Sequence, residues 1–203
     1  MVAALYVEKG GVYWGLPDVD PWDEERDARL YAGPWPVVAH PPCQRWSLLA
    51  PLCEARYGYK VGDDGGTFKA ALEAVRVWGG VLEHPAETKA WKAFGLARPS
   101  TKGGWQRCID GGWVCQVSQV VYGHKARKRT WLYAHGVTWL PSLDWRDFQG
   151  ELVVTTCRGE TRKGAKEMRK KDRSKTPLPF RDLLLSIARN CRSGLSDNCC
   201  GGR

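Results

Sequence analysis

Short apolar segments alternate with segments of helical periodicity along this chain, and this alternation limits the folds open to it. Five segments are typical of short buried strands: residues 3–7, 36–40, 81–83, 117–121 and 130–134. Two segments, 67–78 and 177–189, have the apolar spacing of amphipathic helices. Strand–helix–strand alternation predicts an α/β fold, with a mostly parallel sheet covered by flanking helices.

The chain has 203 residues, which suits one domain over 1–191. Residues 192–203 are rich in Gly, Ser and Cys, so we expect a disordered tail there. No apolar run reaches the roughly 18–20 residues of a membrane span, and the first residues lack the pattern of a secretory signal. We therefore expect a cytoplasmic protein with no membrane partner.

The eight cysteines include no Cys-x-x-Cys pair, the usual spacing of zinc ligands. Without a secretory signal we expect reduced thiols rather than disulfides, and no metal site. One alternative stays open, a metal held by Cys191 together with Cys199 and Cys200.

Basic residues exceed acidic ones, with 31 Lys and Arg against 22 Asp and Glu, for a net charge of +9. This balance favours a polyanionic partner such as DNA. Much of the excess lies in 158–175, which has nine basic and three acidic residues. Such a run is either a solvated surface or an arm that contacts phosphates.

Residues 36–47 carry the most informative motif, Pro-Val-Val-Ala-His-Pro-Pro-Cys-Gln-Arg-Trp-Ser. A predicted strand runs into two stiff prolines, which place Cys43 at the carboxyl end of that strand. Ligands of open α/β sheets bind at such ends. Cys43 is therefore either a nucleophile with a stabilised thiolate or a buried structural cysteine.

Two further segments carry candidate chemistry. Glu83 ends the predicted strand 81–83, where it is either a solvated strand end or a hydrogen-bond partner for a substrate ring nitrogen. Lys125, Arg127 and Arg129 share one parity, so a strand would place them on one face. They form either a protective basic edge or a row of donors to a base carbonyl or phosphate.

In this order and at this spacing, the three segments resemble the DNA cytosine-5 methyltransferases. The family's Pro-Pro-Cys-Gln-x-Phe-Ser is matched by residues 41–47, with Trp46 in place of Phe. Its Glu-Asn-Val is matched only at Glu83, and its Gln-x-Arg-x-Arg by residues 125–129, with Lys125 for Gln. Residues 6–16 resemble its glycine-rich cofactor loop, with Glu8 at the place of the first glycine.

The resemblance implies a Rossmann-like, methyltransferase-type sheet and a covalent attack of Cys43 on C6 of a cytosine flipped out of DNA. It gives further catalytic roles to Glu83, Arg129 and Arg127, and makes 136–175 a reduced target-recognition insertion. It implies S-adenosyl-L-methionine as methyl donor, bound by Tyr6, Gly10, Gly11, Asp20 and Pro41. It implies substrate contacts from Gln44, Trp46, Ser47 and Lys125.

The chain departs from the family between the glycine loop and Cys43, where it is much shorter. This shortening leaves the methyl donor open. Two alternatives follow, an enzyme that transfers one carbon to a free pyrimidine nucleotide, and a catalytically silent relative that binds DNA. The compact size is typical of viral or mobile-element enzymes, so the expected compartment is the cytoplasm of a bacterial or phage-infected cell.

Overall fold

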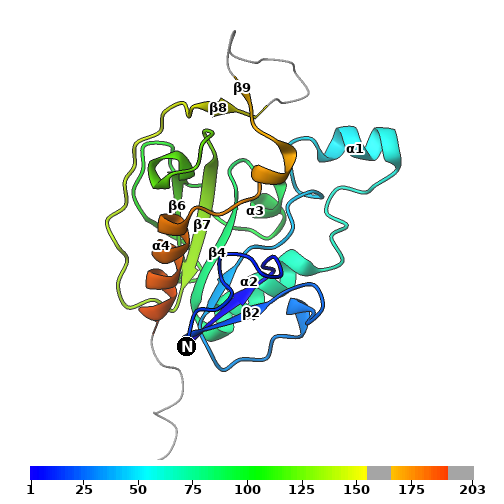
Figure 1. Cartoon of the computed structure of the whole chain (residues 1–203). Coiled ribbons are helices and arrows are strands. Elements are labelled where there is room, and N and C mark those ends of the chain that lie inside the picture. Colours follow the sequence, from blue (N-terminus) through cyan, green and yellow to red (C-terminus); the bar gives the residue numbers. More distant parts are fainter. Residues whose placement is uncertain (155–165, 192–203) are drawn as a thin grey trace, which may run out of the picture.

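The computed structural model describes residues 1–154 and 166–191. A seven-stranded sheet runs through it in the order β2-β1-β3-β4-β7-β6-β5 (Figure 1). Its strands are β1 (Val2–Leu5), β2 (Val19–Trp22), β3 (Val37–Ala39), β4 (Gly80–Pro85), β5 (Gln106–Arg107), β6 (Trp113–Ser118) and β7 (Arg129–His135). A separate two-stranded pair joins β8 (Leu152–Val153) to β9 (Lys166–Glu167).

The described residues also form four α-helices and three short 3-10 helices. The α-helices are α1 (Ala50–Tyr57), α2 (Thr67–Trp78), α3 (Lys89–Ala93) and α4 (Leu178–Arg189). The 3-10 helices are η1 (Ala28–Leu30), η2 (Gln119–Tyr122) and η3 (Lys170–Asp172). Helix α1 projects from the body of the molecule, whereas α2 and α4 lie against the sheet (Figure 1).

The prediction of a mostly parallel, Rossmann-like sheet is wrong, because the sheet is mixed and most of its residue pairs are antiparallel. Strands β2, β1, β3 and β4 are parallel neighbours, but β7 pairs antiparallel with both β4 and β6, and β5 with β6. The link from β6 to β7 explains part of the difference. It spans residues 119–128 and contains only η2, which is too short for the helical crossover that parallel neighbours need.

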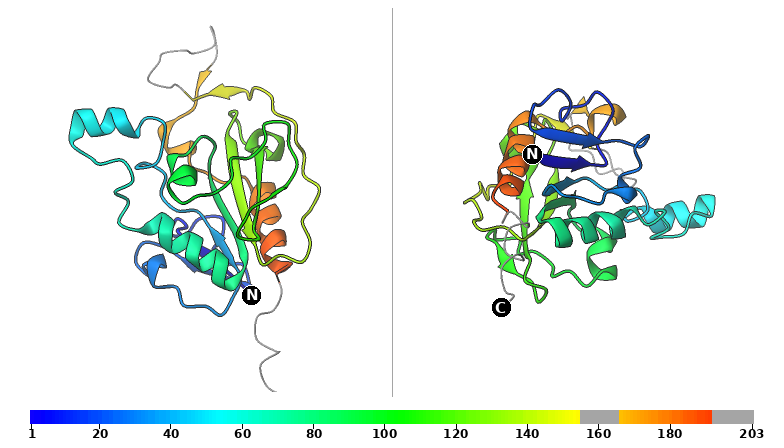
Figure 2. Two further views of the ribbon diagram at one scale, coloured as in Figure 1. Left: turned by 180° about the vertical axis from the view of Figure 1, so that it is seen from behind. Right: turned by 90° about the horizontal axis from the view of Figure 1, so that it is seen from below.

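Two apolar clusters cover the two faces of the sheet, as expected when both faces carry a helix. On one face, Phe68, Leu72 and Val75 of α2 pack with Leu82 and Tyr133. On the other face, α4 packs on alternate residues of the same strands (Figure 2). The side-chain alternation of β4 therefore directs Leu82 toward α2 and its neighbours Val81 and Glu83 toward the side of α4.

Gly80 fixes the pairing of β3 with β4. Its φ is +125°, and a Cβ at this position would lie 1.9 Å from the carbonyl oxygen of Val37. Only glycine fits here. The parallel register then pairs Ala39 with Leu82, which places the next residues, His40 and Glu83, side by side.

Most predicted strands and both predicted helices are present, with shifted ends. Helix α2 covers the predicted range 67–78 and is followed by Gly79. Strands β2, β5, β8 and β9 and helices α1 and α3 were not predicted, and the segment 117–121 is divided between β6 and η2. Residues 22–31, an acidic stretch whose composition is compatible with a helix, contain only the short 3-10 helix η1.

Part of the predicted organisation lies outside the described residues. This holds for the tail 192–203, with Cys199 and Cys200, and for 158–165 of the basic run. The described parts of the 136–175 insertion contribute β8, β9 and η3. No helix within 1–154 or 166–191 is long and apolar enough to cross a membrane.

Candidate active site

Glu83 is the centre of a buried polar network at the carboxyl end of β4. Its Oε2 lies 3.0 Å from Nδ1 of His40, and its Oε1 accepts a 3.1 Å hydrogen bond from Nε2 of Gln119. The same Gln119 nitrogen donates to Oγ1 of Thr130 on β7. Burial alone would raise the pKa of Glu83, but the His40 hydrogen bond and the charge of Lys128 hold that pKa at about 2. The carboxyl group is therefore ionised at neutral pH.

His40 connects Glu83 to Tyr13, which lies in the loop after β1. Nε2 of His40 is 2.8 Å from the Tyr13 hydroxyl. Tyr13 is buried, and this burial raises its pKa well above the ordinary value, so the hydroxyl keeps its proton. The hydroxyl then donates to Nε2, and the proton of a neutral His40 sits on Nδ1, facing the Glu83 carboxylate.

Cys43 lies three residues beyond His40 and is half-buried. Its carbonyl accepts a 3.0 Å hydrogen bond from the Trp46 amide, which closes a tight turn over 43–46. Burial raises the pKa of the Cys43 thiol, the negative charge of Glu83 raises it further, and the charge of Lys128 opposes both. The thiol and the carboxylate thus act on one another, and the resting sulfur is protonated.

Lys128 is one of the site residues that sequence reasoning missed. It precedes β7, is partly buried, and its positive charge acts on both Cys43 and Glu83. One sequence signal could have identified it, namely that residue 128 lies two positions before Thr130, so strand alternation places both side chains on the same face. Thr130 points to Gln119 and Glu83, so alternate positions along this segment lead back to 128 rather than to 129.

The expectation that Lys125, Arg127 and Arg129 share a strand face is wrong, because β7 begins only at Arg129. Lys125 is exposed, and Arg127 pairs in bidentate fashion with Asp147. Arg129 is exposed at the first position of β7, next to Thr130, so strand alternation directs it to the opposite face. The cation near Glu83 and Cys43 is Lys128.

Trp46 belongs to the core instead of forming a stacking surface for a base. It is 7% exposed and packs against Phe68 and Phe94. Its indole Nε1 donates a 2.8 Å hydrogen bond to Asp64. Gln44 is exposed in the same turn, and the Ser47 hydroxyl donates to the Gln44 carbonyl at 3.4 Å. These two residues remain available to a substrate, whereas Trp46 anchors the loop.

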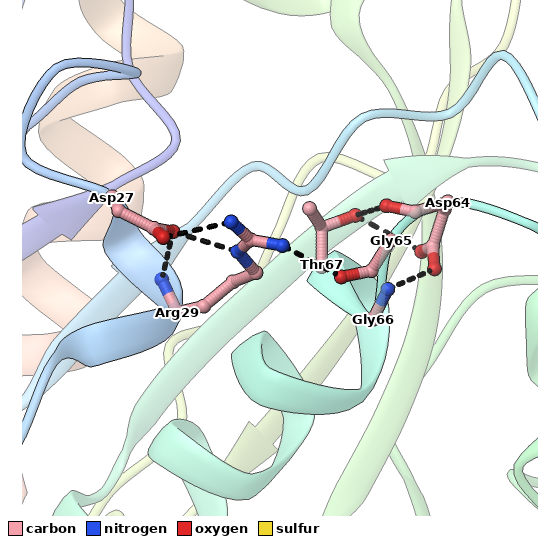
Figure 3. A network of polar contacts seen from close by, with 6 residues as sticks. All are labelled: Asp27, Arg29, Asp64, Gly65, Gly66 and Thr67. Carbon is pink, nitrogen blue, oxygen red and sulfur yellow. Dashed lines mark hydrogen bonds and ion pairs between the residues drawn. The ribbon is translucent and has the colours of Figure 1, made fainter.

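Asp64 ties this loop to the start of α2. Besides binding Trp46, it accepts hydrogen bonds from the Gly66 and Phe68 amides and from the Thr67 hydroxyl. Figure 3 shows part of this network, in which Arg29 joins the carboxylate of Asp27 to the Gly65 carbonyl. The helix N-terminus and the cysteine loop therefore share one anchor.

The residues expected to bind the methyl donor lie in several places. Gly10 has a φ of +68°, and the Gly11 amide closes a turn on the Glu8 carbonyl at 2.9 Å. Tyr6 packs against the cluster on the α2 side of the sheet. Asp20 pairs with Arg26 and accepts a hydrogen bond from the Trp22 indole. Pro41 is buried.

A cleft of about 330 Å³ opens at the carboxyl ends of β1 and β2. Its lining is mostly charged: Val7, Glu8, Lys9, Asp23, Glu24 and Glu25. Lys9 pairs with Glu25 at 2.7 Å. Three acidic side chains therefore follow β2, where the sequence reasoning had chosen Asp20 within the strand. Clefts at the ends of parallel strands are common ligand sites.

Within 1–154 and 166–191, no three His, Cys, Asp or Glu side chains are grouped to hold a metal ion. Comparison of the chain with protein-family models, with curated proteins and with solved structures finds no match.

Proposed function

We propose that this chain modifies carbon 5 of a cytosine in DNA, and that Cys43 forms a covalent bond to carbon 6 of the base. The observation that carries the proposal is that Cys43 in the loop after β3, Glu83 in β4 and Lys128 just before β7 act electrostatically on one another. A nucleophile, a fixed carboxylate and a cation are the three groups that this chemistry requires. The order of the motifs along the chain supports the same assignment.

The chemistry follows from the electronic structure of the pyrimidine. Carbon 5 is a poor nucleophile while the ring is conjugated, and addition of a thiolate at carbon 6 breaks the C5–C6 double bond and makes carbon 5 enamine-like. After carbon 5 has attacked the electrophile, loss of its proton and elimination of the Cys43 thiolate restore the double bond and release the base. Glu83 accepts a hydrogen bond from the exocyclic amine, and Lys128 stabilises the thiolate form of Cys43. Because a base inside a duplex cannot reach this site, the cytosine has to flip out of the stack.

A basic surface of the protein lies beside the site, and we expect it to bind the DNA backbone. The Leu152 amide donates to the Lys125 carbonyl at 2.9 Å, and β8 pairs with β9, so Lys166 and Glu167 lie near the segment that leads to Lys128, and η3 follows them in sequence. Exposed basic side chains here are Lys125, Lys166, Arg169, Lys170, Lys171 and Lys175. Such groups bind phosphates in a salt-dependent way.

The acidic cleft fits S-adenosyl-L-methionine by its chemistry. The carboxylates after β2 can accept hydrogen bonds from ribose hydroxyls, and their negative charge suits a sulfonium cation. Glu24 and Glu25, together with the turn at Gly10 and Gly11, would hold this molecule. When bound, it supplies an electrophilic methyl group.

The test is covalent trapping. Purified protein is incubated with S-adenosyl-L-methionine and duplex DNA that carries 5-fluorocytosine, and the complex is analysed by mass spectrometry after proteolysis. The proposal expects an adduct on the peptide that contains Cys43, and none in Cys43→Ala. DNA binding without an adduct would favour a catalytically silent DNA-binding protein, and turnover of free dCMP equal to that of DNA would favour a nucleotide-level enzyme.

A further inference from the structure

We propose that His40 is a positioning residue for this site: its Nδ1 proton holds Oε2 of Glu83, and the Tyr13 hydroxyl on Nε2 fixes the tautomer that makes this possible. The inference rests on the proposed function only for the identity of the substrate. The hydrogen-bond chain itself is a property of the folded protein and is measurable without any reaction.

The geometry places a proton on Nδ1 of His40. The chain runs from Tyr13 to His40 at 2.8 Å and from His40 to Glu83 at 3.0 Å, and all three side chains are largely or fully buried. A tyrosine hydroxyl that donates to a neutral His40 leaves the imidazole proton on Nδ1, and a charged His40 carries a proton there as well, so in both states Nδ1 donates to the carboxylate. The other tautomer would place the lone pair of Nδ1 against an anion.

Glu83 is held from two sides, with His40 on Oε2 and Gln119 on Oε1. An ionised carboxylate has about four acceptor positions, so these two bonds fix its plane and leave about two positions for substrate N–H groups. A carboxylate that is already oriented loses no rotational freedom when the base enters. His40 therefore acts through Glu83, without touching the ring.

Charged and titratable groups surround the hydrogen-bonded series Tyr13–His40–Glu83. They are Cys43 on the loop after β3, His84 on β4, Lys128 before β7, and Arg181 and Asp182 on α4. The charge of Lys128 lowers the pKa of Glu83, and the charge of Arg181 lowers the pKa of Tyr13, which Glu83 and Asp182 raise. None of these groups replaces the His40 hydrogen bond to Oε2.

Two substitutions of His40 test its hydrogen bond to Glu83 and its hydrogen bond to Tyr13 separately. His40→Asn places an amide nitrogen near the position of Nδ1, so it keeps a donor toward Glu83 and loses the Tyr13 contact. His40→Gln places its amide near the position of Nε2, so it keeps the Tyr13 contact and loses the donor. Tyr13→Phe removes one hydroxyl, keeps the buried ring, and tests the tautomer if the histidine variants do not fold.

The first measurement is the titration of the Glu83 carboxyl by ¹³C NMR, with Glu83→Gln to assign the resonance and thermal unfolding to confirm the fold. Wild type and His40→Asn should show no titration of this resonance down to pH 4. His40→Gln should raise the pKa from about 2 by about two units or more, so that the resonance titrates at pH 4 and above. Equal titration of His40→Gln and wild type would overturn the proposal.

The second measurement is the rate of the Cys43 adduct with 5-fluorocytosine DNA. Loss of positioning predicts a rate at saturating DNA that falls at least about tenfold in His40→Gln, with partial rescue in His40→Asn and little change in DNA affinity. If wild type forms no adduct, the proposed function fails while the NMR titration still decides the role of His40. Equal adduct rates in all three proteins would overturn the positioning role.

Discussion

Oε2 of Glu83 lies 3.0 Å from Nδ1 of His40, and this contact joins the ends of two parallel strands whose site residues are 43 positions apart in sequence. The contact is possible because the β3–β4 register pairs Ala39 with Leu82. The cysteine loop leaves β3 directly after it, so the carboxylate influences the nucleophile through space.

Removing the charge of Glu83 should make Cys43 more reactive toward a simple alkylating agent. Burial and the Glu83 charge both raise the pKa of the Cys43 thiol, so Glu83→Gln lowers that pKa. We expect iodoacetamide to label Cys43 roughly three- to tenfold faster at pH 8, because the thiolate fraction increases. Peptide mass spectrometry measures the rate, with Cys108 as internal reference. A slower reaction in the variant would contradict the arrangement.

Removing the charge of Lys128 should have the opposite effect. Lys128 lowers the pKa of both Cys43 and Glu83, so Lys128→Gln reduces the thiolate fraction at a given pH. The same alkylation assay should give a rate about two- to fivefold lower. Lys125→Gln is the matched control, because Lys125 is exposed and acts on neither group. An equal effect of the two substitutions would speak against a specific role of Lys128.

Acid should destabilise the fold through His84. Burial lowers the pKa of His84 to about 4, so the unfolded chain takes up this proton first as the pH falls below about 6.5. The stabilisation is present above pH 6.5 and is lost progressively toward pH 4, with about 3 kcal/mol involved. Urea unfolding between pH 7 and pH 4.5 measures it. His84→Asn should be less stable at pH 7 but should lose less stability over this range.

Asp64 should stabilise both the loop that carries Cys43 and the start of α2. Burial alone would raise its pKa, but hydrogen bonds from Trp46, Phe68, Thr67 and Gly66 hold that pKa below its usual value. Asp64→Ala should cost about 2 kcal/mol or more in unfolding free energy, because it removes a cap and leaves the Trp46 indole unpaired. Asp63→Ala is the neighbouring exposed control and should change stability by less than about 0.5 kcal/mol.

The basic surface should appear in the salt dependence of DNA binding. Lys170 and Lys171 are exposed in η3, which follows β9 in sequence. If both contact phosphates, the double substitution by Gln lowers the slope of log K against log salt by about 1.8. Fluorescence anisotropy at several salt concentrations measures the slope. Lys69→Gln on α2, which pairs with Glu73, should leave it unchanged.

The sequence was sufficient for elements whose apolar spacing is regular. Helix α2, between Thr67 and Gly79, is such a case, since its buried residues recur every three to four positions. The strand directions could not be predicted in the same way. Whether β7 lies parallel or antiparallel to β4 depends on the connection that precedes it, and apolar runs contain no sign of direction.

Of the candidate site, too, only some residues could be predicted from the sequence. Cys43 and Glu83 were predicted from strands that end in chemically active residues, and the structure makes them electrostatic neighbours. His40 and Tyr13 were missed, because their partnership depends on a loop after β1 that returns to the end of β3. Trp46 was assigned to a substrate because of its neighbour Cys43, although large aromatic side chains fill cores more often.

Gly80 has a consequence for how this chain can evolve. Gln44 is exposed in the loop that carries Cys43, so a substitution at this position would leave the core unchanged. Position 80 accepts no other residue, because even one added methyl group would collide with the Val37 backbone and separate β3 from β4. Descendants of this gene that diverge in chemistry should therefore keep a glycine at a point that no substrate touches.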